Sequence, residues 1–535
     1  KVIAASASGS PSSMKISVNG TQQSVLNFPG LAATNGLLVN EAIYNGTIPA
    51  SNDLVTVQLE HNKQGNPSSE AFIDYITVKA TRTLRFNGTQ FSFTPNYANP
   101  NSTTVNLTLD NTAQVQEVWE VSDLFNVKTI VNPNLNQMSF RTNVTSEPKF
   151  NIVTNQNYYL PRYSSNSRVF NSNIKGTIFK NSNGVFQDID YLMLTTTSHL
   201  SQANRLAQIN RDKKGLNVKV VTVESIYNEF NCGNPDIAAI RNLVRYVYTN
   251  ASNPNNRLKY LCLFGDTSYD YKGRISSNLY NLPTWNALSS FNLTTSFISD
   301  DFYGMMDLGE GNLNTSDRLD IAVGRIVADS PLKAKQMVDK VEKHYSINSI
   351  GSWRNNVLVV SDDVDVDWER VLQNTTDQIG NEISQQKPFI NVKKIHSDAY
   401  QQQATAGGDR YPEVNSAISN EAEKGVLVVN YFGHGGEDGL ASERIYNISE
   451  VVNLRNVCKY HCFVTVTCEY TKFDNPLRLT AGEFTYWNPD GGAIALITTT
   501  RQIFVPVGVA VNVTLGEYLY SYSTNDTFGP NEYPS

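Results

Sequence analysis

Hydrophobic and polar positions alternate along the first third of the chain, and the period then lengthens. Up to about residue 185, short runs such as residues 54–59 and 72–78 alternate apolar with polar side chains, and turn-rich segments separate them. Alternation with a period of two is typical of strands that bury one face. We therefore expect residues 1–185 to form a β-rich region of one or two β-sandwich units, with a structural or partner-binding role.

From about residue 186, short and nearly continuous apolar runs alternate with segments of helical period. The predicted strands of this stretch are residues 190–195, 216–223, 258–264 and 319–325, and the predicted helices are residues 202–213, a segment opened by Pro235, and residues 330–345. Ser330 is the expected N-cap of the last helix, with Pro331 as its first residue. Such alternation is typical of parallel strands covered by helices, so residues 186–350 form one predicted α/β half.

A second series of the same kind follows and completes the domain. Its predicted strands are residues 357–360, 392–395, 426–431, 463–467 and 493–498, and its predicted helices are residues 368–385 and 411–423. Residues 351–535 are therefore the second predicted α/β half. The chain as a whole is expected to have a mixed fold, in which a β-sandwich-like N-terminal region precedes an α/β domain of two side-by-side parallel-sheet halves.

Two predicted strands of the second half end at residues that carry chemistry. The run at 426–431 leads into Gly433-His434-Gly435-Gly436, and the run at 463–467 leads into Cys468. Ligands of parallel sheets bind beyond the carboxyl ends of the strands, where a thiol beside an imidazole suits nucleophilic catalysis. The backbone N–H groups of Gly435 and Cys468 are the expected oxyanion hole. A buried cysteine or a His-Gly turn is more often structural when it occurs alone, but the two together favour catalysis.

A catalytic imidazole needs a third group to orient it, and the neighbouring predicted strand ends in Asp362 and Asp363. Adjacent residues point in different directions, so at most one of the two serves, and we predict Asp363. The alternative is that both are solvated or bind a cation together with the acids of residues 365–369. That acidic cluster, like Asp300-Asp301, is a candidate for structural Ca²⁺, although it lacks the loop of an EF-hand. No cofactor is expected in the chemistry itself.

Composition and charge exclude several classes of function. Charged residues make up 17% of the chain and the net charge is −7, so no basic surface for nucleic acid is expected. No apolar run approaches the roughly 18 residues of a membrane span. The five cysteines are few and odd in number, which argues against a disulfide framework. Cys458 and Cys462 flank His461, but no second ligand pair with zinc spacing follows them.

The motifs at the two strand ends resemble those of the gingipain family of cysteine peptidases, which have a caspase-like fold. The matching features are Asn430-Tyr431-Phe432-Gly433-His434-Gly435, Thr467-Cys468 and the Asp-Ile-Ala-Val-Gly-Arg run of residues 320–325, and the resemblance covers about 186–535. It is closer to the sortase members of that family, through residues 467–474, 481–483 and 491–501. The resemblance implies that His434 is the catalytic base, that Cys468 is the nucleophile and that the acidic third residue lies at the Asp362/Asp363 strand end.

The function that this resemblance implies is more specific than anything the residues themselves imply. It implies an enzyme at the cell surface, associated with the outer membrane, that serves the type IX secretion system of Bacteroidetes. Such an enzyme removes the C-terminal signal domain of exported cargo proteins. It then passes the new carboxyl end to anionic lipopolysaccharide, while docked to an outer-membrane β-barrel partner.

Two alternatives stay open on the sequence. One is a gingipain-like secreted endopeptidase that only hydrolyses, and the other is a non-catalytic surface scaffold. Intact His434 and Cys468 argue against the scaffold, but hydrolysis and transfer share an acyl-enzyme, so the pair does not separate the two enzymes. Arg501 follows the run at 493–498, where gingipains shape the pocket for the substrate residue before the scissile bond. An arginine that points into this pocket would disfavour basic substrate residues.

Overall fold

The chain folds into two compact units. The computed structural model describes residues 1–535 except 33–35, 50–53, 97–102, 134, 144–146, 156–157, 159, 161, 163–170, 276–281 and 521–535. Unit 1 comprises residues 1–6, 12–28 and 41–171, and unit 2 comprises residues 7–11, 29–40 and 172–535. Unit 2 thus begins its long continuous part at Ser172, before the change of pattern near residue 185. The last part of the predicted second half, residues 521–535, lies outside the described residues.

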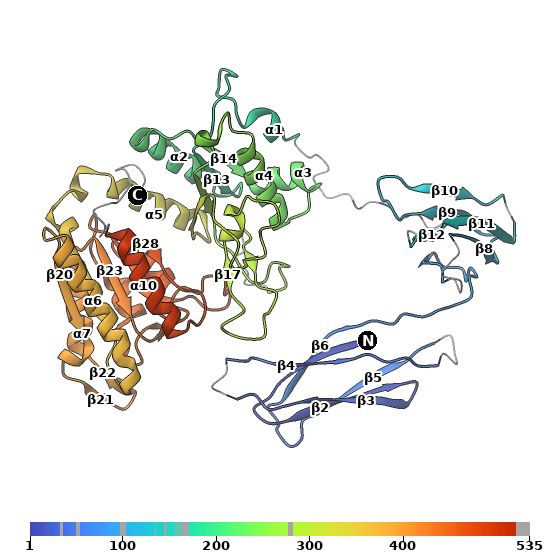
Figure 1. Ribbon diagram of the computed structural model, residues 1–535, viewed down its shortest axis with the longest axis horizontal. Coiled ribbons are helices and arrows are strands. Elements are labelled where there is room, and N and C mark those ends of the chain that lie inside the picture. Colours follow the sequence, from blue (N-terminus) through green and yellow to red (C-terminus); the bar gives the residue numbers. More distant parts are fainter. Residues whose placement is uncertain are drawn as a thin grey trace. The chain divides into compact units, whose positions relative to one another are not determined.

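The first β-rich part of unit 1 has two sheets that share one core (Figure 1), and β2 pairs antiparallel with both β3 and β5. Its strands are β1 (Val2–Ala7), β2 (Ser12–Val18), β3 (Thr21–Phe28), β4 (Asn40–Tyr44), β5 (Val57–Asn62) and β6 (Glu70–Ile76). The sheets have the orders β4-β1-β6 and β3-β2-β5. Alternate residues of both sheets, such as Ala4, Ile16 and Phe28, are buried against one another. The period-two pattern therefore builds the predicted sandwich.

A second β-rich part repeats this arrangement with its own core. Its strands are β7 (Ser92–Phe93), β8 (Thr104–Asp110), β9 (Val115–Glu120), β10 (Lys128–Val131), β11 (Gln137–Asn143) and β12 (Phe150–Thr154). They form sheets of order β10-β9-β12-β7 and β11-β8. Leu109, Val118, Phe140 and Phe150 come from both sheets and form one buried cluster. The β-rich character predicted for this region is confirmed.

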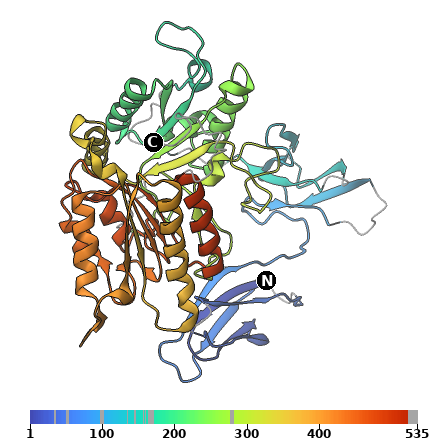
Figure 2. The ribbon, with the colours of Figure 1, turned by 60° about the vertical axis from the view of Figure 1, so that its left-hand side comes forward.

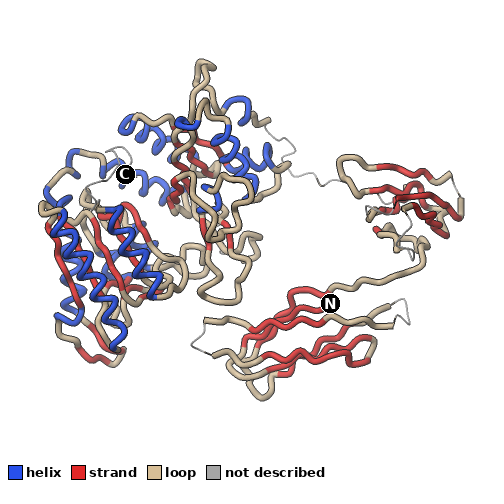
Figure 3. Tube along the Cα trace, viewed as in Figure 1, coloured by secondary structure: helices blue, strands red, loops and turns tan. Residues whose placement is uncertain are grey.

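The first α/β half of unit 2 has a four-stranded parallel sheet of order β14-β13-β15-β18. Its elements are α1 (Ile174–Thr177), β13 (Tyr191–Thr195), α2 (Leu200–Lys214), β14 (Val218–Thr222), α3 (Val223–Phe230), α4 (Ile237–Thr249), η1 (Pro254–Asn256), β15 (Tyr260–Phe264), β16 (Trp285–Asn286), β17 (Ile298–Ser299), η2 (Asp301–Gly304), β18 (Ala322–Ile326), α5 (Pro331–His344), η3 (Ile347–Ser349) and η4 (Ser352–Asn355). Helices α3 and α4 cover one face of the sheet, while α2 and α5 cover the other. Figure 3 shows these helices on either side of the strands.

The N-cap of α5 in this half is the one predicted from the sequence, whereas the predicted start of α4 has to be corrected. Ser330 caps α5 by accepting a hydrogen bond from the Lys333 N–H, and Pro331 is the first helical residue, as predicted. Pro235 does not open α4. Instead the Asp236 side chain accepts from the Ala238 N–H as the N-cap, because a carboxylate satisfies a free N–H that proline cannot.

The second half has a five-stranded parallel sheet of order β20-β19-β23-β27-β28. Its elements are β19 (Asn356–Ser361), η5 (Asp367–Glu369), α6 (Arg370–Gln386), β20 (Asn391–His396), η6 (Ser397–Ala399), β21 (Gln403–Thr405), β22 (Gly408–Arg410), α7 (Pro412–Lys424), β23 (Val428–Phe432), β24 (Gly435–Gly436), β25 (Gly439–Leu440), β26 (Tyr446–Asn447), α8 (Ile448–Asn453), β27 (His461–Val466), α9 (Ala481–Trp487), β28 (Ala493–Ile497) and α10 (Val505–Leu519). Helices α6 and α10 lie side by side on one face (Figure 2), and α7, α8 and α9 cover the other.

Helix α10 packs directly beneath the two strand ends that carry the candidate chemistry. A β-carbon on its Gly508 would come within 2.9 Å of the Phe432 ring and 3.2 Å of Val466, so only glycine permits this close approach. The buried Asn512 of the same helix accepts a hydrogen bond of 2.8 Å from the Asn430 side chain. The sequence did not predict α10, because its apolar residues show no helical period. Among the described residues, no helix is long and apolar enough to span a membrane.

Candidate active site

His434 and Cys468 occupy equivalent positions on neighbouring strands. β23 and β27 are parallel, with Phe432 paired to Val466, and each candidate residue follows two residues later. Neighbouring strands lie about 4.8 Å apart. The two loops also touch, since a β-carbon at Gly435 would lie only 2.6 Å from the Thr467 Oγ1 atom. The structure therefore places side by side the two strand ends that carry these residues.

The backbone beside Cys468 is held in an unfavourable conformation. Glu469 has a φ of +51°, in the left-handed region that side-chain-bearing residues rarely adopt, and such strain is common at reactive sites. Burial raises the pKa of the half-buried Cys468 thiol, the Ile503 N–H opposes this rise, and the negative charge of Glu469 adds to it. A thiol of this kind needs a base to become a nucleophilic thiolate.

The His434 side chain is 46% exposed and has one hydrogen-bonding nitrogen still available. Its Nε2 atom lies 3.1 Å from Glu369 Oε1, and its ring meets Trp368 edge-on at 5.9 Å between centroids. Within the described part of the chain, Nδ1 has no hydrogen-bond partner. Glu369 is therefore placed to orient the imidazole and to stabilise its charged form, while Nδ1 is left to accept a proton.

The prediction that Asp363 orients the His434 imidazole is wrong, because the Asp363 carboxylate has other hydrogen-bond partners. Asp363 is buried, and it accepts hydrogen bonds from the Tyr411 hydroxyl at 3.1 Å and from Gln402 Nε2 at 3.4 Å. Asp362 instead accepts the backbone N–H of His434 at 2.7 Å. The chain leaves β19 and returns through η5, so Glu369 at the start of α6 reaches the ring.

The sequence pattern did not distinguish Glu369 from the other acidic residues that follow β19. Its Oε2 atom accepts the N–H groups of Asp365 at 2.8 Å and Val366 at 3.0 Å, which fixes this short loop and leaves Oε1 for His434. Only 7% of Glu369 is exposed. One sequence signal could have identified Glu369 as the partner of His434. Glu369 lies at the start of a predicted helix, where the backbone fixes the direction of a carboxylate side chain.

The two groups predicted for the oxyanion hole lie in the loops that touch. Gly435 begins the hairpin of β24 and β25, where it pairs with Leu440. Among the described residues, the Cys468 N–H donates no hydrogen bond, so it is free to bind a developing oxyanion. The role of these two N–H groups stays a prediction.

The interpretation of Arg501 as a substrate-binding residue has to be corrected. Its guanidinium is only 8% exposed and forms a bidentate pair with the fully buried Asp474, with Nη1 at 2.8 Å and Nη2 at 2.6 Å from the carboxylate oxygens. A charge neutralised in this way is not offered to a substrate. The Arg501 carbonyl accepts the Glu469 N–H at 3.3 Å, so the residue supports the loop that carries Cys468.

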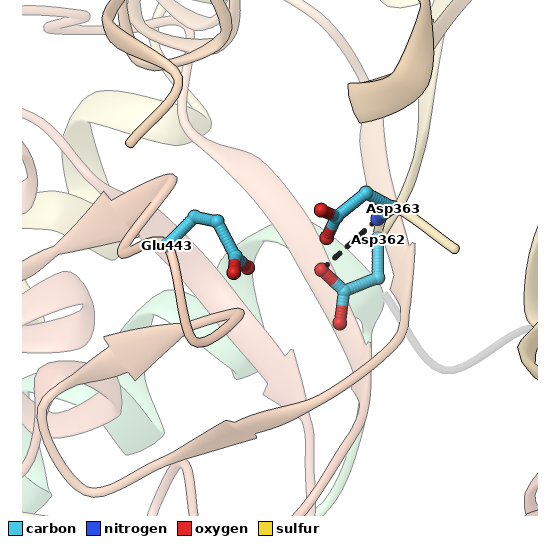
Figure 4. A group of neighbouring side chains, drawn as sticks. All are labelled: Asp362, Asp363 and Glu443. Carbon is cyan, nitrogen blue, oxygen red and sulfur yellow. Dashed lines mark hydrogen bonds between the residues drawn. The ribbon is translucent and has the colours of Figure 1, made fainter. Parts of the chain in front are cut away.

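Three buried carboxylates lie on the other side of the His434 backbone. Oxygen atoms of Asp362, Asp363 and Glu443 all lie within 4.8 Å of one another, and the Glu443 carboxylate points toward the aspartate pair (Figure 4). Burial and mutual repulsion raise the pKa of Asp362 well above its ordinary value and that of Glu443 to about 7. Carboxylate oxygens are the ligands that Ca²⁺ prefers. Structural Ca²⁺ stays a prediction, with this cluster as the place to test it.

Among the described residues, the other metal-ligand candidates predicted from the sequence are not gathered into a group of three or more ligand atoms. Asp300 is engaged by the Arg325 guanidinium at 2.7 Å and 2.8 Å. Within the residues that the structure describes, Cys458, His461 and Cys462 do not come together as ligands. All five cysteines are free, which agrees with the expected lack of a disulfide framework.

One cavity lies close to the segment after Cys468 but apart from His434 and Cys468 themselves. It has a volume of about 1070 Å³ and lies along β18 and β28, the edge strands of the two sheets. Thr471 and Phe473, from the segment after Cys468, reach its wall, but neither His434 nor Cys468 lines it. The candidate residues at the carboxyl ends of β23 and β27 therefore lie outside the wall of this cavity.

Comparison with known proteins identifies the family of the α/β unit. The family model described as peptidase family C25 matches residues 185–531. Dimeric latent PorU from Porphyromonas gingivalis has a similar structure, with a TM-score of 0.54 and 21% identity over 66% of this chain and 34% of PorU. The aligned part of this chain thus spans about a third of the length of that PorU chain. The Arg-specific cysteine proteinase gingipain R aligns with a TM-score of 0.47 and 17% identity, over 64% of this chain and 71% of gingipain R. No curated protein matches the sequence.

Proposed function

Because the chain belongs to peptidase family C25, a family of cysteine peptidases, we propose that Cys468 is its nucleophile, His434 its base and Glu369 the carboxylate that orients the base. The observation that supports this assignment best is the parallel register of β23 and β27, which delivers the thiol and the imidazole at one edge of the sheet. The scaffold alternative is disfavoured, because a half-exposed imidazole held by a buried carboxylate is an arrangement suited to proton transfer.

The proposed reaction begins with proton transfer from Cys468 Sγ to His434 Nδ1. The thiolate attacks the carbonyl carbon of the scissile bond, and the oxygen takes up the electron pair as an oxyanion, facing the N–H groups of Gly435 and Cys468. As the tetrahedral intermediate collapses, the C–N bond breaks and the imidazolium gives its proton to the leaving amine. The acyl-enzyme is a thioester on Cys468, which water or another acceptor then cleaves with His434 as base.

At a finer level, we propose that the enzyme is a cell-surface sortase of the type IX secretion system. It removes the C-terminal signal domain of exported cargo and transfers the new carboxyl end to anionic lipopolysaccharide, at an outer-membrane β-barrel partner. The similarity to PorU in fold and the sortase-like run at residues 467–474 support this proposal. A transferase must keep an acceptor close to the thioester while limiting access of water.

The second candidate is a gingipain-like endopeptidase that only hydrolyses. The neutralised Arg501 removes the reason to expect that basic substrate residues are repelled, so a gingipain-like specificity is no longer disfavoured. Hydrolysis and transfer use the same catalytic groups, and only the fate of the thioester separates them.

The two candidates are separated by incubating purified enzyme with a cargo that bears its C-terminal signal and with increasing amounts of a soluble amine or hydroxyl acceptor. Mass spectrometry of the cargo C-terminus supports the sortase if acceptor-bearing product forms. Hydrolysed cargo at every acceptor concentration would leave the endopeptidase. The Cys468→Ala enzyme is the control, and it should yield neither product.

A further inference from the structure

An ionic network joins the loop of His434 to the loop of Cys468. Lys472 Nζ lies 2.8 Å from Glu469 Oε1 and 3.2 Å from Glu437 Oε1. Glu469 directly follows Cys468, and Glu437 lies three residues after His434. We call these three side chains the loop clamp. They are 17%, 16% and 13% exposed for Lys472, Glu469 and Glu437, so water screens them less than an ordinary surface pair.

Other contacts of the clamp show that it is tied to the surrounding framework. The Glu437 carbonyl accepts the N–H of Ala481, the first residue of α9, at 2.8 Å. Arg478 also reaches Glu437 at 2.9 Å, but its side chain is 53% exposed. Lys472 is therefore the sheltered cation between the two catalytic loops, and it holds the side chain of the residue whose φ is +51°.

The clamp also affects the charge around the nucleophile. The carboxylate of Glu469 raises the pKa of the Cys468 thiol, which disfavours the reactive thiolate. Burial opposes a charge on Lys472, but its hydrogen bonds and charge interactions with Glu469 and Glu437 raise its pKa, so the ammonium is present at neutral pH. The Lys472 ammonium, paired with Glu469, offsets the rise in the Cys468 pKa that the Glu469 carboxylate causes.

The charged groups around the clamp come from two further segments. Burial raises the pKa of the Tyr269 hydroxyl, from the insert that follows β15, and the charges of Asp474, Lys472, Asp270 and Glu437 also act on it. Asp474 is already paired with Arg501. None of these groups supplies a second cation to Glu469, for which Lys472 is the salt-bridge partner within the described residues.

We propose that Lys472 is a positioning residue for Cys468: it fixes the Cys468 loop against the His434 loop and compensates the charge of Glu469 beside the nucleophile. This inference rests on the proposed role of Cys468. It assigns to the Thr-Cys-Glu-Tyr-Thr-Lys run a function in which the cysteine, the glutamate and the lysine act together.

The test measures the pH profile of Cys468 alkylation by iodoacetamide in the full chain, with the modified peptide identified by mass spectrometry. Lys472→Met should move the profile to higher pH and slow alkylation at pH 7 by about three- to tenfold, since about one pKa unit changes the thiolate fraction tenfold. Glu469→Gln should move the profile to lower pH. The double variant should fall between the two, and Lys472→Arg should retain the wild-type profile.

Peptidase kinetics and a matched control complete the test. Lys472→Met should lower kcat more than it raises KM, whereas Lys394→Met, which breaks a salt bridge to Asp377 at 2.6 Å in the same half, should change neither. Unchanged alkylation and kcat in Lys472→Met would overturn the inference, and so would slower alkylation in both Lys472→Met and Glu469→Gln. If Lys472→Met does not fold, the alkylation profiles of Glu469→Gln and Lys472→Arg still test the inference. A Glu469→Gln profile that does not move to lower pH would overturn it. An unreactive Cys468 in an inactive wild-type enzyme would instead overturn the proposed function.

Discussion

The two parallel sheets of unit 2 have the same kind of architecture, but the polar side chains near their strand ends differ in exposure and in hydrogen-bond partners. In the first half, Arg325 is 5% exposed on its side chain and forms a bidentate pair with Asp300, and it also donates to the Gly265 carbonyl. His199 is buried, its Nδ1 atom shares a hydrogen bond of 2.8 Å with the Thr196 hydroxyl, and its Nε2 atom has no partner among the described residues. In the second half, His434 is 46% exposed with Nδ1 unpartnered among the described residues, and Cys468 is half-buried.

This difference separates a structural strand end from a reactive one. Buried polar groups are nearly always satisfied by partners, which makes them rigid and inert. The first sheet pairs the guanidinium of Arg325 with the carboxylate of Asp300 within the fold. We therefore expect it to support stability. The second sheet leaves an imidazole and a thiol incompletely paired at one edge, so we expect it to carry the chemistry.

The largest effect should come from the two cysteines that occupy these contrasting environments. Cys468→Ala should lower peptidase activity by about 10⁵-fold or more, because no covalent intermediate can form. Cys262→Ala, in the buried strand β15, should leave activity unchanged and lower the free energy of unfolding by about 1 kcal/mol. Peptide hydrolysis and thermal unfolding of both variants check this. A Cys468→Ala enzyme that keeps its activity would break the comparison.

The next largest effect should be on the stability of the first half. Arg325→Met leaves the Asp300 carboxylate, whose side chain is only 15% exposed, unpaired and should cost about 3–5 kcal/mol of unfolding free energy. The double variant Arg325→Met/Asp300→Leu should recover much of this loss. Denaturant unfolding gives the stabilities, and activity per folded molecule should stay at the wild-type level. A loss of activity without a loss of stability would show that this sheet takes part in the chemistry.

A smaller effect is expected at the carboxylate that orients His434. Glu369→Gln should lower kcat by about 10²-fold, because the amide cannot stabilise an imidazolium as a carboxylate does. Asp363→Asn, which changes a residue bonded to Tyr411 and Gln402, should lower kcat less. Steady-state kinetics of both variants provide the measurement. A larger effect at Asp363 would restore the assignment made from the sequence.

The smallest effect should be the pH dependence of the carboxylate cluster. The pKa of Glu443 is about 7 in the folded protein and about 4.3 when unfolded, so its proton stabilises the fold below about pH 4 and that stability is lost as pH rises through 7. Without Ca²⁺, we expect this group to contribute about 1 kcal/mol less at pH 8 than at pH 4, after allowance for solvent screening.

Calcium should counteract this loss. Thermal unfolding with Ca²⁺ and with a chelator should differ more at pH 8 than at pH 5, because only the ionised carboxylates bind the cation. Glu443→Gln should flatten the pH dependence and remove the response to Ca²⁺. Equal unfolding temperatures with and without Ca²⁺ at pH 8 would contradict a calcium site here.

The sequence predicted most strands of the parallel sheets, several of their helices and the candidate pair at two strand ends, because these depend on local patterns. It did not predict α10, whose apolar residues show no helical period. Parallel pairing places consecutive strand ends at one edge, so the residues that follow β23 and β27 had to be neighbours. The direction of Asp363 and Glu369 depends instead on how the chain turns between β19 and α6, which no periodicity records. The partner of Arg501 is Asp474, 27 residues away along the chain, and only the folded structure brings them together.

The most direct test of the catalytic edge is competitive labelling of the five free cysteines in the folded enzyme. A thiol-directed electrophile with a peptide-like recognition group should modify Cys468 first, and His434→Ala should slow that reaction. Cys262 and Cys462 should stay unlabelled, because burial raises the pKa of Cys262 to about 12 and of Cys462 to about 11. Labelling of Cys232 or Cys462 with Cys468 spared would contradict the assignment of the nucleophile.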